Sequence, residues 1–182
     1  MVVCTIGHST LEASALVAVL QAHGVAQVAD VRRFPASRRQ PQFNGAELAR
    51  TLAVHGLGYS HFAALGGRRE PQPASRNAGW REPGFRGYAD YMQTPAFGAA
   101  ICRLLALAGE APTAILCAEK DWRLCHRGLI SDWLKAGGVE VVHLIDAQRA
   151  EAHPYTAPAV VADGRLSYPA PPPAQGALDL GG

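Results

Sequence analysis

The sequence contains no uninterrupted apolar run long enough to cross a bilayer, so we expect no transmembrane helix and no membrane partner. Its first residues include no basic segment followed by an apolar stretch, which predicts a protein that is not exported. The four cysteines are irregularly spaced and form no Cys-x-x-Cys pair, unlike a disulfide framework. We therefore expect a cytoplasmic protein with reduced thiols.

Aromatic residues are scarce, at 7%, and the net charge is only +2. By contrast, 48% of the 182 residues are apolar, which predicts a folded domain with a sizeable core. The charge is unevenly distributed: from Arg32 to Arg86 there are ten arginines, no lysine and three acidic residues. Guanidinium groups bind phosphate and carboxylate in a bidentate manner, so this distribution favours an anionic partner.

Apolar segments alternate with amphipathic ones along most of the chain. Strands are predicted at 2–7, 25–32, 57–62, 113–117 and 139–145, and helices at 8–24, 44–56, 94–109 and 126–138. Strands that alternate with helices predict an α/β fold with three layers, a mostly parallel sheet covered by helices on both faces.

The boundaries of this α/β domain are expected at residues 1 and 146. Residues 147–182 form a C-terminal extension with a short hairpin at about 159–168, around Asp163-Gly164, and a disordered proline-rich end. Residues 64–87 show no periodicity and are predicted to be a loop. Ser9 and Glu12 match a capping box for the first helix.

Polar residues follow three of the predicted strands, at the edge where open parallel sheets bind ligands. The three segments read "GHS" from Gly7, "DVRRFPASRR" from Asp30 and "CAEKDWRLCHR" from Cys117. If the first, second and fourth strands are neighbours, these segments form one cluster. This prediction depends on the order of the strands in the sheet.

Several residues of this cluster have two interpretations. Ser9 caps a helix or helps to bind an anion, and His8 is a structural or a catalytic residue. Asp30 is either ion-paired with Arg32 or a general base. Arg38 and Arg39 form a solvated charge pair, or one of them binds substrate while the other pairs with an acid.

Three kinds of chemistry compete for the segment from Cys117 to Arg127. Cys125, placed at a helix start beside Arg127, has the features of a low-pKa nucleophile, whereas Cys117 is expected to be inert. The six-residue spacing from Cys117 to Arg123 resembles phosphatase loops, but Glu119 and Asp121 would repel phosphate.

A metal site is the second possibility, formed by Cys117, Cys125 and His126 with His8. Adjacent residues of a helix point about 100° apart, which argues against Cys125 and His126 as ligands of one ion. The third possibility is acid/base chemistry by carboxylates on an anionic substrate held by arginines, with Glu119 as the proton-transfer group. Of the three possibilities, acid/base chemistry by carboxylates conflicts least with the expected geometry.

The predicted loop adds two further groups. Gly66-Gly67 allows the backbone to approach a ligand closely. Tyr88 and Tyr91 stack on a ligand, donate a hydrogen bond or pack over the sheet edge, and packing is the stronger interpretation for Tyr91.

These motifs together resemble the domain-of-unknown-function 488 family. The resemblance rests on "TIGHST", "DVRRFPASRRQPQFN", "LGGRR", "GFRGYADYM", "LCAEKDWRLCHRGLI" and "VVHL", in this order over about residues 3 to 145. It implies a small cytoplasmic α/β protein suspected of being an enzyme, without an established activity. The functional residues that it implies are His8, Ser9, Asp30, Arg32, Ser37, Arg38, Arg39, Tyr88, Cys117, Glu119, Cys125, His126 and Arg127.

We therefore predict an enzyme, a hydrolase or a transferase, that acts on an anionic and phosphate-bearing substrate such as a nucleotide or nucleic acid. The predicted catalytic residues are Asp30, Glu119, His8, Cys125 and His126. The predicted substrate-binding residues are Ser9, Arg32, Ser37, Arg38, Arg39, Tyr88 and Arg127. A non-catalytic nucleic-acid-binding module and a Cys/His metal-binding protein remain alternatives, and the sequence specifies neither a cofactor nor an oligomeric state.

Overall fold

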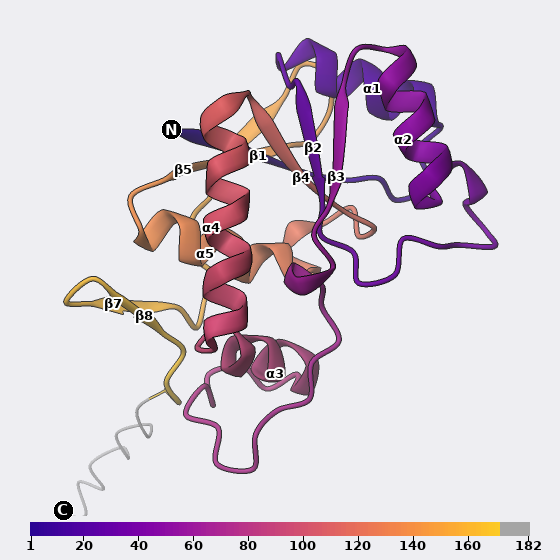
Figure 1. Cartoon of the computed structure of the whole chain (residues 1–182). Coiled ribbons are helices and arrows are strands. Elements are labelled where there is room, and N and C mark those ends of the chain that lie inside the picture. Colours follow the sequence, from indigo (N-terminus) through magenta and orange to yellow (C-terminus); the bar gives the residue numbers. More distant parts are fainter. Residues whose placement is uncertain (172–182) are drawn as a thin grey trace, which may run out of the picture.

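A central sheet of six strands organises the computed structural model, which describes residues 1–171 (Figure 1). The strands are β1 (Val2–Gly7), β2 (Gln27–Asp30), β3 (Gly58–His61), β4 (Thr113–Cys117), β5 (Glu140–Leu144) and β6 (Ala150–Ala152). Their order across the sheet is β3-β2-β4-β1-β5-β6, and only β6 is antiparallel to its neighbour. The carboxyl ends of β1, β2 and β4 therefore lie side by side.

Helices cover both faces of the sheet, which confirms the predicted three-layer α/β fold. Helices α1 (Ala13–Ala22) and α2 (Gly45–Val54) pack on one face, where Leu16, Leu20, Leu48 and Leu52 are fully buried. The other face carries α4 (Pro95–Glu110) and α5 (Arg127–Ala136), and α3 (Pro83–Tyr91) packs against α5 beyond the ends of the strands (Figure 1). None of the helices in residues 1–171 is both long and apolar enough to cross a membrane.

The helix starts explain two differences from the predicted elements. The expected capping box at Ser9 and Glu12 is wrong: α1 begins only at Ala13, and neither side chain caps it. Ser9 instead has a positive φ of 47°, in a turn between β1 and the helix. Residues 83–87 of α3 lie in the predicted loop, but Pro83 at the first helical position and the Glu82 carboxylate, which accepts a hydrogen bond from Phe85 N, start the helix there.

The C-terminal extension packs against the α/β domain. Its hairpin consists of β7 (Val160–Ala162) and β8 (Arg165–Ser167), and Asp163 and Gly164 both have positive φ, as a type I′ hairpin turn requires. Most of the proline-rich end that was expected to be disordered lies at 172–182, outside the described residues.

A buried polar chain joins this extension to the sheet. Asp132 of α5 accepts hydrogen bonds from His153 Nε2, at 3.0 Å, and from the Tyr168 hydroxyl. His143 Nε2 and His153 Nδ1 are 2.8 Å apart, and Thr5 Oγ1 is 2.7 Å from His143 Nδ1. Because the Asp132 carboxylate only accepts, the donors run from Thr5 through the two histidines to Asp132.

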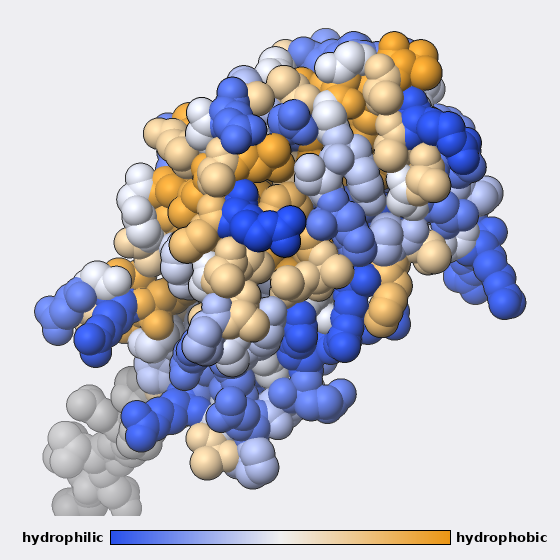
Figure 2. Space-filling view, viewed as in Figure 1, coloured by the Kyte–Doolittle hydropathy of each residue, from blue (hydrophilic) through white to orange (hydrophobic). Residues whose placement is uncertain are grey.

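Hydrophilic side chains are concentrated on one part of the face seen in Figure 2. They gather over its lower half, where Figure 1 places α3 and the segment before it. Arginines of that segment, among them Arg68 and Arg81, are exposed.

Candidate functional site

A cavity with a volume of about 800 Å³ opens at the carboxyl ends of β1, β2 and β4. Of the residues predicted from the sequence, it is lined by His8, Ser9, Arg32, Ser37, Arg39, Cys117, Glu119, Cys125 and His126. The segments that follow the three strands thus meet in one place, as predicted from their adjacency. Asp30, Arg38, Tyr88 and Arg127 do not line this cavity.

The floor of the cavity forms because β1 and β4 remain paired beyond their ends. His8 N donates to Cys117 O at 3.0 Å, and Ser9 N donates to Ala118 O at 2.8 Å. This close approach requires glycine at position 7, because a Cβ atom there would lie 1.7 Å from the backbone oxygen of Glu119. Gly7 therefore fixes the segment that carries Cys117 and Glu119 against the end of β1.

Asp30 and Arg32 adopt the ion-paired alternative. Both Asp30 oxygens accept from Arg32 Nε, at 2.9 and 3.1 Å, and Asp30 also accepts from the Tyr59 hydroxyl at 2.8 Å. Asp30 is completely buried, so its carboxylate does not reach the cavity. Asp30 therefore positions Arg32 and does not contact a ligand in the cavity.

His8 is held with both ring nitrogens engaged. Arg32 Nη1 donates to His8 Nε2 at 3.2 Å, so the neutral ring donates from Nδ1 to Ser9 O at 3.0 Å. The ring stacks on Phe43, with centroids 4.1 Å apart. Burial, and then the charge of Arg32, lower the pKa of His8 from its ordinary value, which keeps the ring neutral.

Three other arginines, Arg33, Arg39 and Arg68, supply charge to the cavity. They are exposed, and no carboxylate in residues 1–171 lies within ion-pair distance of them. Arg33 Nη1 donates to the backbone oxygen of Arg68 at 2.8 Å, which joins the segment after β2 to the segment before α3. Two glutamates, Glu82 and Glu119, also line the cavity, and Glu119 is exposed without a hydrogen-bonding partner among the described side chains.

Two thiols and an imidazole form one wall of the cavity. His126 Nδ1 lies 4.0 Å from Cys117 Sγ and 3.8 Å from Cys125 Sγ. The neighbouring Cys125 thiol, and then His126 and Arg127, lower the pKa of Cys117 well below its ordinary value, against the opposite effect of burial. The proximity of Cys117, together with burial, raises the pKa of Cys125.

The local backbone explains why the lowered thiol pKa belongs to Cys117 and not, as expected, to Cys125. Helix α5 begins at Arg127, and Cys125 precedes it in an extended conformation, with φ −133° and ψ 142°. Cys125 therefore gains less from the helix dipole than was expected. The objection that adjacent helical residues diverge by 100° is also wrong for Cys125 and His126, because neither lies within the helix.

Arg127 and Tyr88, two predicted binding residues, have structural positions. The Arg127 side chain is buried and donates to the backbone oxygens of Glu119 and Lys120, each at 2.7 Å, so it holds the segment after β4. Tyr88 is fully buried and donates to Leu65 O at 2.7 Å. It packs against the ring of His126, with centroids 5.0 Å apart, so packing is the better interpretation for Tyr88.

Some lining residues were not predicted from the sequence: Thr10, Arg33, Phe34, Ala36, Gln40, Arg68, Glu82, Gly84, Phe85, Ala118 and Leu124. Arg33 and Arg68 belong to arginine pairs beside segments that had been singled out, which is a signal that could have found them. Phe34 and Leu124 are 68% and 70% exposed, an unusual placement for large apolar side chains that sequence alone does not predict.

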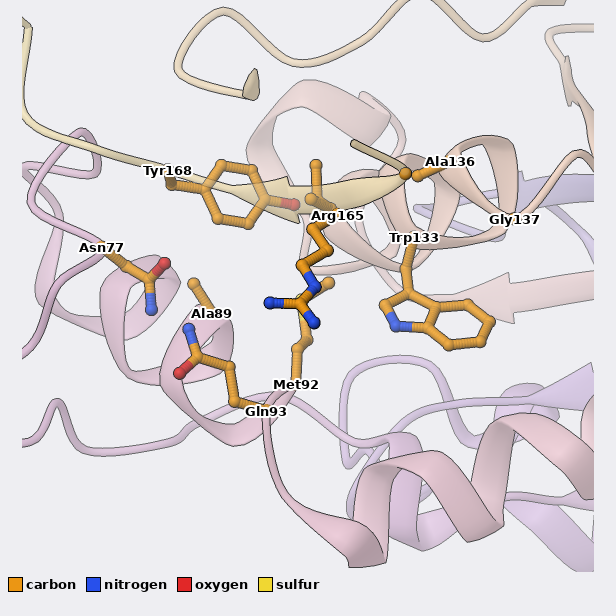
Figure 3. A pocket seen from close by; sticks show the side chains of 11 residues that line it. Asn77, Ala89, Met92, Gln93, Trp133, Ala136, Gly137, Arg165 and Tyr168 are labelled. Atoms are coloured by element: carbon orange, nitrogen blue, oxygen red, sulfur yellow. The ribbon is translucent and has the colours of Figure 1, made fainter. Parts of the chain in front are cut away.

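A second cavity, of about 360 Å³, lies between the C-terminal hairpin and helices α3 and α5 (Figure 3). Arg165 reaches into it from β8, between Met92 and Trp133. None of the predicted site residues lines it, and within residues 1–171 Arg165 is the only charged residue that does. The predicted site residues that line either of these cavities therefore all line the larger one.

Comparison with known proteins gives one match. Neither the curated proteins nor the solved structures contain a match to the chain. The family model described as "Domain of unknown function DUF488" matches residues 12–134, more than half of the chain and most of the segments that line the larger cavity. The chain belongs to the DUF488 family of domains of unknown function.

Proposed function

We propose that the protein is an enzyme that binds an anionic, phosphate-bearing substrate such as a nucleotide in the larger cavity and acts on it by acid/base chemistry. The observation that supports this proposal is a set of arginines, Arg33, Arg39 and Arg68, that have no acidic partner within residues 1–171 and line a cavity shared with Glu119. Charge-assisted hydrogen bonds from guanidinium groups suit phosphate oxygens. The position at the carboxyl ends of parallel strands is where open α/β sheets bind their ligands.

The roles within the cavity follow from what each side chain already contacts. Arg32 is engaged by Asp30 and His8, so it preorganises the floor, and the arginines near the rim bind the substrate. Glu82 accepts a hydrogen bond from Phe85 N, whereas the side-chain oxygens of Glu119 accept none within residues 1–171, so Glu119 transfers the proton. Exposed Phe34 supports a substrate with a planar group, because it offers a ring face beside the arginines.

A panel of nucleotides and other phosphate esters, incubated with the purified protein and analysed by mass spectrometry, tests this function. Conversion of at least one compound is expected, and Glu119→Gln should reduce its rate by about 10²- to 10⁴-fold, as loss of a general acid or base does. Glu110→Gln, at the exposed end of α4, is the matched control and should leave the rate unchanged. An unchanged rate in Glu119→Gln would remove its assigned role, and a panel without binding or conversion would contradict the function.

The same exposed groups also favour a second candidate, a non-catalytic nucleic-acid-binding module. Phe34 could stack on a base while Arg33, Arg38 and Arg39 contact phosphates of a single strand. Such binding weakens steeply as salt is added, since it depends on counterion release. Binding of a thymidine oligonucleotide that falls steeply with salt and is lost in Phe34→Ala, without conversion of any small anion, would favour this candidate.

A further inference from the structure

Three atoms that commonly bind transition metals face one another in the wall of the larger cavity. Cys117 Sγ, Cys125 Sγ and His126 Nδ1 all lie within 4.8 Å of one another. They come from the end of β4 and the residues just before α5. All three residues line the cavity, so an ion between them would be accessible from it.

The separations are close to those of a tetrahedral site. Zinc bonds of about 2.3 Å to sulfur and about 2.1 Å to nitrogen, at a tetrahedral angle, place the two atoms about 3.6 Å apart. The observed sulfur-to-nitrogen distances are 4.0 Å for Cys117 and 3.8 Å for Cys125. Shifts of a few tenths of an ångström would therefore bring both sulfur-to-nitrogen separations to the tetrahedral value, and the two sulfurs lie within 4.8 Å of each other.

The ring of His126 is oriented as a metal ligand would be. Its Nε2 lies 3.2 Å from the backbone oxygen of Val31, which can only accept, so Nε2 carries the proton. In the neutral ring Nδ1 is then unprotonated, and it faces the two sulfurs. Metal-bound histidines commonly donate their other ring N–H to a backbone carbonyl in this way.

Glycine at position 67 keeps the space beside Nδ1 free. A Cβ atom there would lie 2.9 Å from His126 Nδ1. Gly67 also lines the cavity, so the lone pair of Nδ1 is covered by no side chain at this position.

We propose that Cys117, Cys125 and His126 bind a zinc ion whose fourth coordination position is open to the cavity. Two thiolates balance the charge of a divalent ion, and sulfur with imidazole is the donor set that zinc prefers. Three protein ligands with one open position are typical of catalytic rather than structural zinc sites. A water or substrate oxygen at that position would share the cavity with Glu119, two residues after Cys117. The metal site does not depend on the proposed substrate.

Titration of the reduced, full-length protein with Co²⁺, followed by competition with Zn²⁺, tests the site. We expect one equivalent of cobalt and a thiolate-to-cobalt charge-transfer band that Zn²⁺ abolishes. Cys117→Ser and Cys125→Ser should each weaken zinc binding by at least about tenfold. Mutating a residue that only hydrogen-bonds to a metal ligand already causes a loss of this size. The control is Cys4→Ser with Cys102→Ser, the two other free cysteines, which should keep full binding.

Gly67→Val provides a variant that keeps every ligand. Its side chain would enter the space beside His126 Nδ1, so it should weaken metal binding while circular dichroism shows an unchanged fold. The proposal is overturned if the fully reduced protein binds no stoichiometric cobalt, if binding depends on Cys4 and Cys102, or if the Cys117 and Cys125 variants bind as the wild type does. Adenosine monophosphate binding measured on the metal-free protein separates these outcomes from failure of the proposed function.

Discussion

The carboxylate of Asp30 and the guanidinium of Arg32 form a bidentate ion pair that is almost completely buried at the end of β2. The pair orients Arg32 so that Nη1 donates to His8 and to Phe43 O, at 3.2 and 2.8 Å. The loop after β2 and the end of β1 are thereby connected before any ligand binds. The floor of the cavity is thus preorganised, and the residues that remain available to a ligand lie nearer its rim.

Asp30→Asn should destabilise the protein strongly, because it leaves the buried guanidinium of Arg32 without its counter-charge. Removing one partner of a buried pair costs about 3–5 kcal/mol in the free energy of unfolding. Urea-induced unfolding measures this loss. Glu47→Gln, which breaks the exposed pair with Arg50, is the control and should change stability by less than about 1 kcal/mol. Equal losses in both variants would show that the Asp30 pair has no special structural role.

Arg39→Ala and Arg68→Ala should each weaken the binding of adenosine monophosphate by about tenfold or more. A hydrogen bond to a charged group contributes about 1.5–3 kcal/mol, and 1.4 kcal/mol corresponds to a factor of ten. Isothermal titration calorimetry at fixed salt measures the change. Arg50→Ala, on α2 and outside the cavity, should bind as the wild type does. If Arg50→Ala causes the same loss, binding reflects general surface charge rather than the cavity.

Gly7→Ala should disturb the site through the backbone. Its Cβ would lie 1.7 Å from the Glu119 oxygen, so the segment after β4 must move away from β1. Overpacking of this kind costs about 1–3 kcal/mol, which thermal or urea unfolding would reveal.

The control is Gly98→Ala in helix α4, where a Cβ meets no atom within 4 Å. It should stabilise the protein by about 0.5–1 kcal/mol, because alanine has the higher helix propensity. A Gly7→Ala variant as stable as Gly98→Ala would contradict the observed closeness of the two segments.

Stability should fall in acid because of His143. Burial, followed by the charges of His153, Arg127 and Arg123, lowers the pKa of His143 to about 3. Below an unfolded pKa of about 6.5, the unfolded state binds a proton that the folded state does not. This group's stabilisation is therefore complete above that pH and is lost by about 1.4 kcal/mol per pH unit as the pH falls toward 3.

The free energy of unfolding measured between pH 7 and 5 checks this slope. His143→Gln, which cannot take up the proton, should reduce the average slope over this range by about 1 kcal/mol per unit, because the unfolded histidine is only partly protonated near pH 6.5. His55→Gln, at the exposed end of α2, is the matched control and should keep the slope of the wild type. An identical slope in His143→Gln and the wild type would show that His143 is not the group responsible.

The sheet, and the approach of the segments that follow β1, β2 and β4, could be predicted from the sequence. The spacing of apolar residues and the positions at which strands end are local properties of the sequence. "TAILC" became β4 with the expected bounds, and the polar segments after β1, β2 and β4 line one cavity. The fate of individual side chains could not be predicted in the same way. Arg127 points inward because the segment after β4 folds back over it, and that fold is fixed by contact with Gly7.

The burial of Tyr88 could not be predicted from the sequence either. Its burial follows from helix α3, which a proline at the first position and a local cap create in a stretch without hydrophobic periodicity. Cys125 and His126 can face the same point because α5 begins only at Arg127. A helix that began one or two residues earlier would direct the two side chains apart. Such boundaries are decided by caps and tertiary contacts rather than by the pattern itself.

The central claim is that an anionic substrate occupies the cavity at the ends of β1, β2 and β4. A crystal structure of the protein grown with adenosine monophosphate tests it most directly. We predict phosphate oxygens within hydrogen-bond distance of Arg39 or Arg68, with the ligand beside Glu119. A cavity that stays free of nucleotide at saturating concentration, or a nucleotide bound only elsewhere on the molecule, would contradict the account.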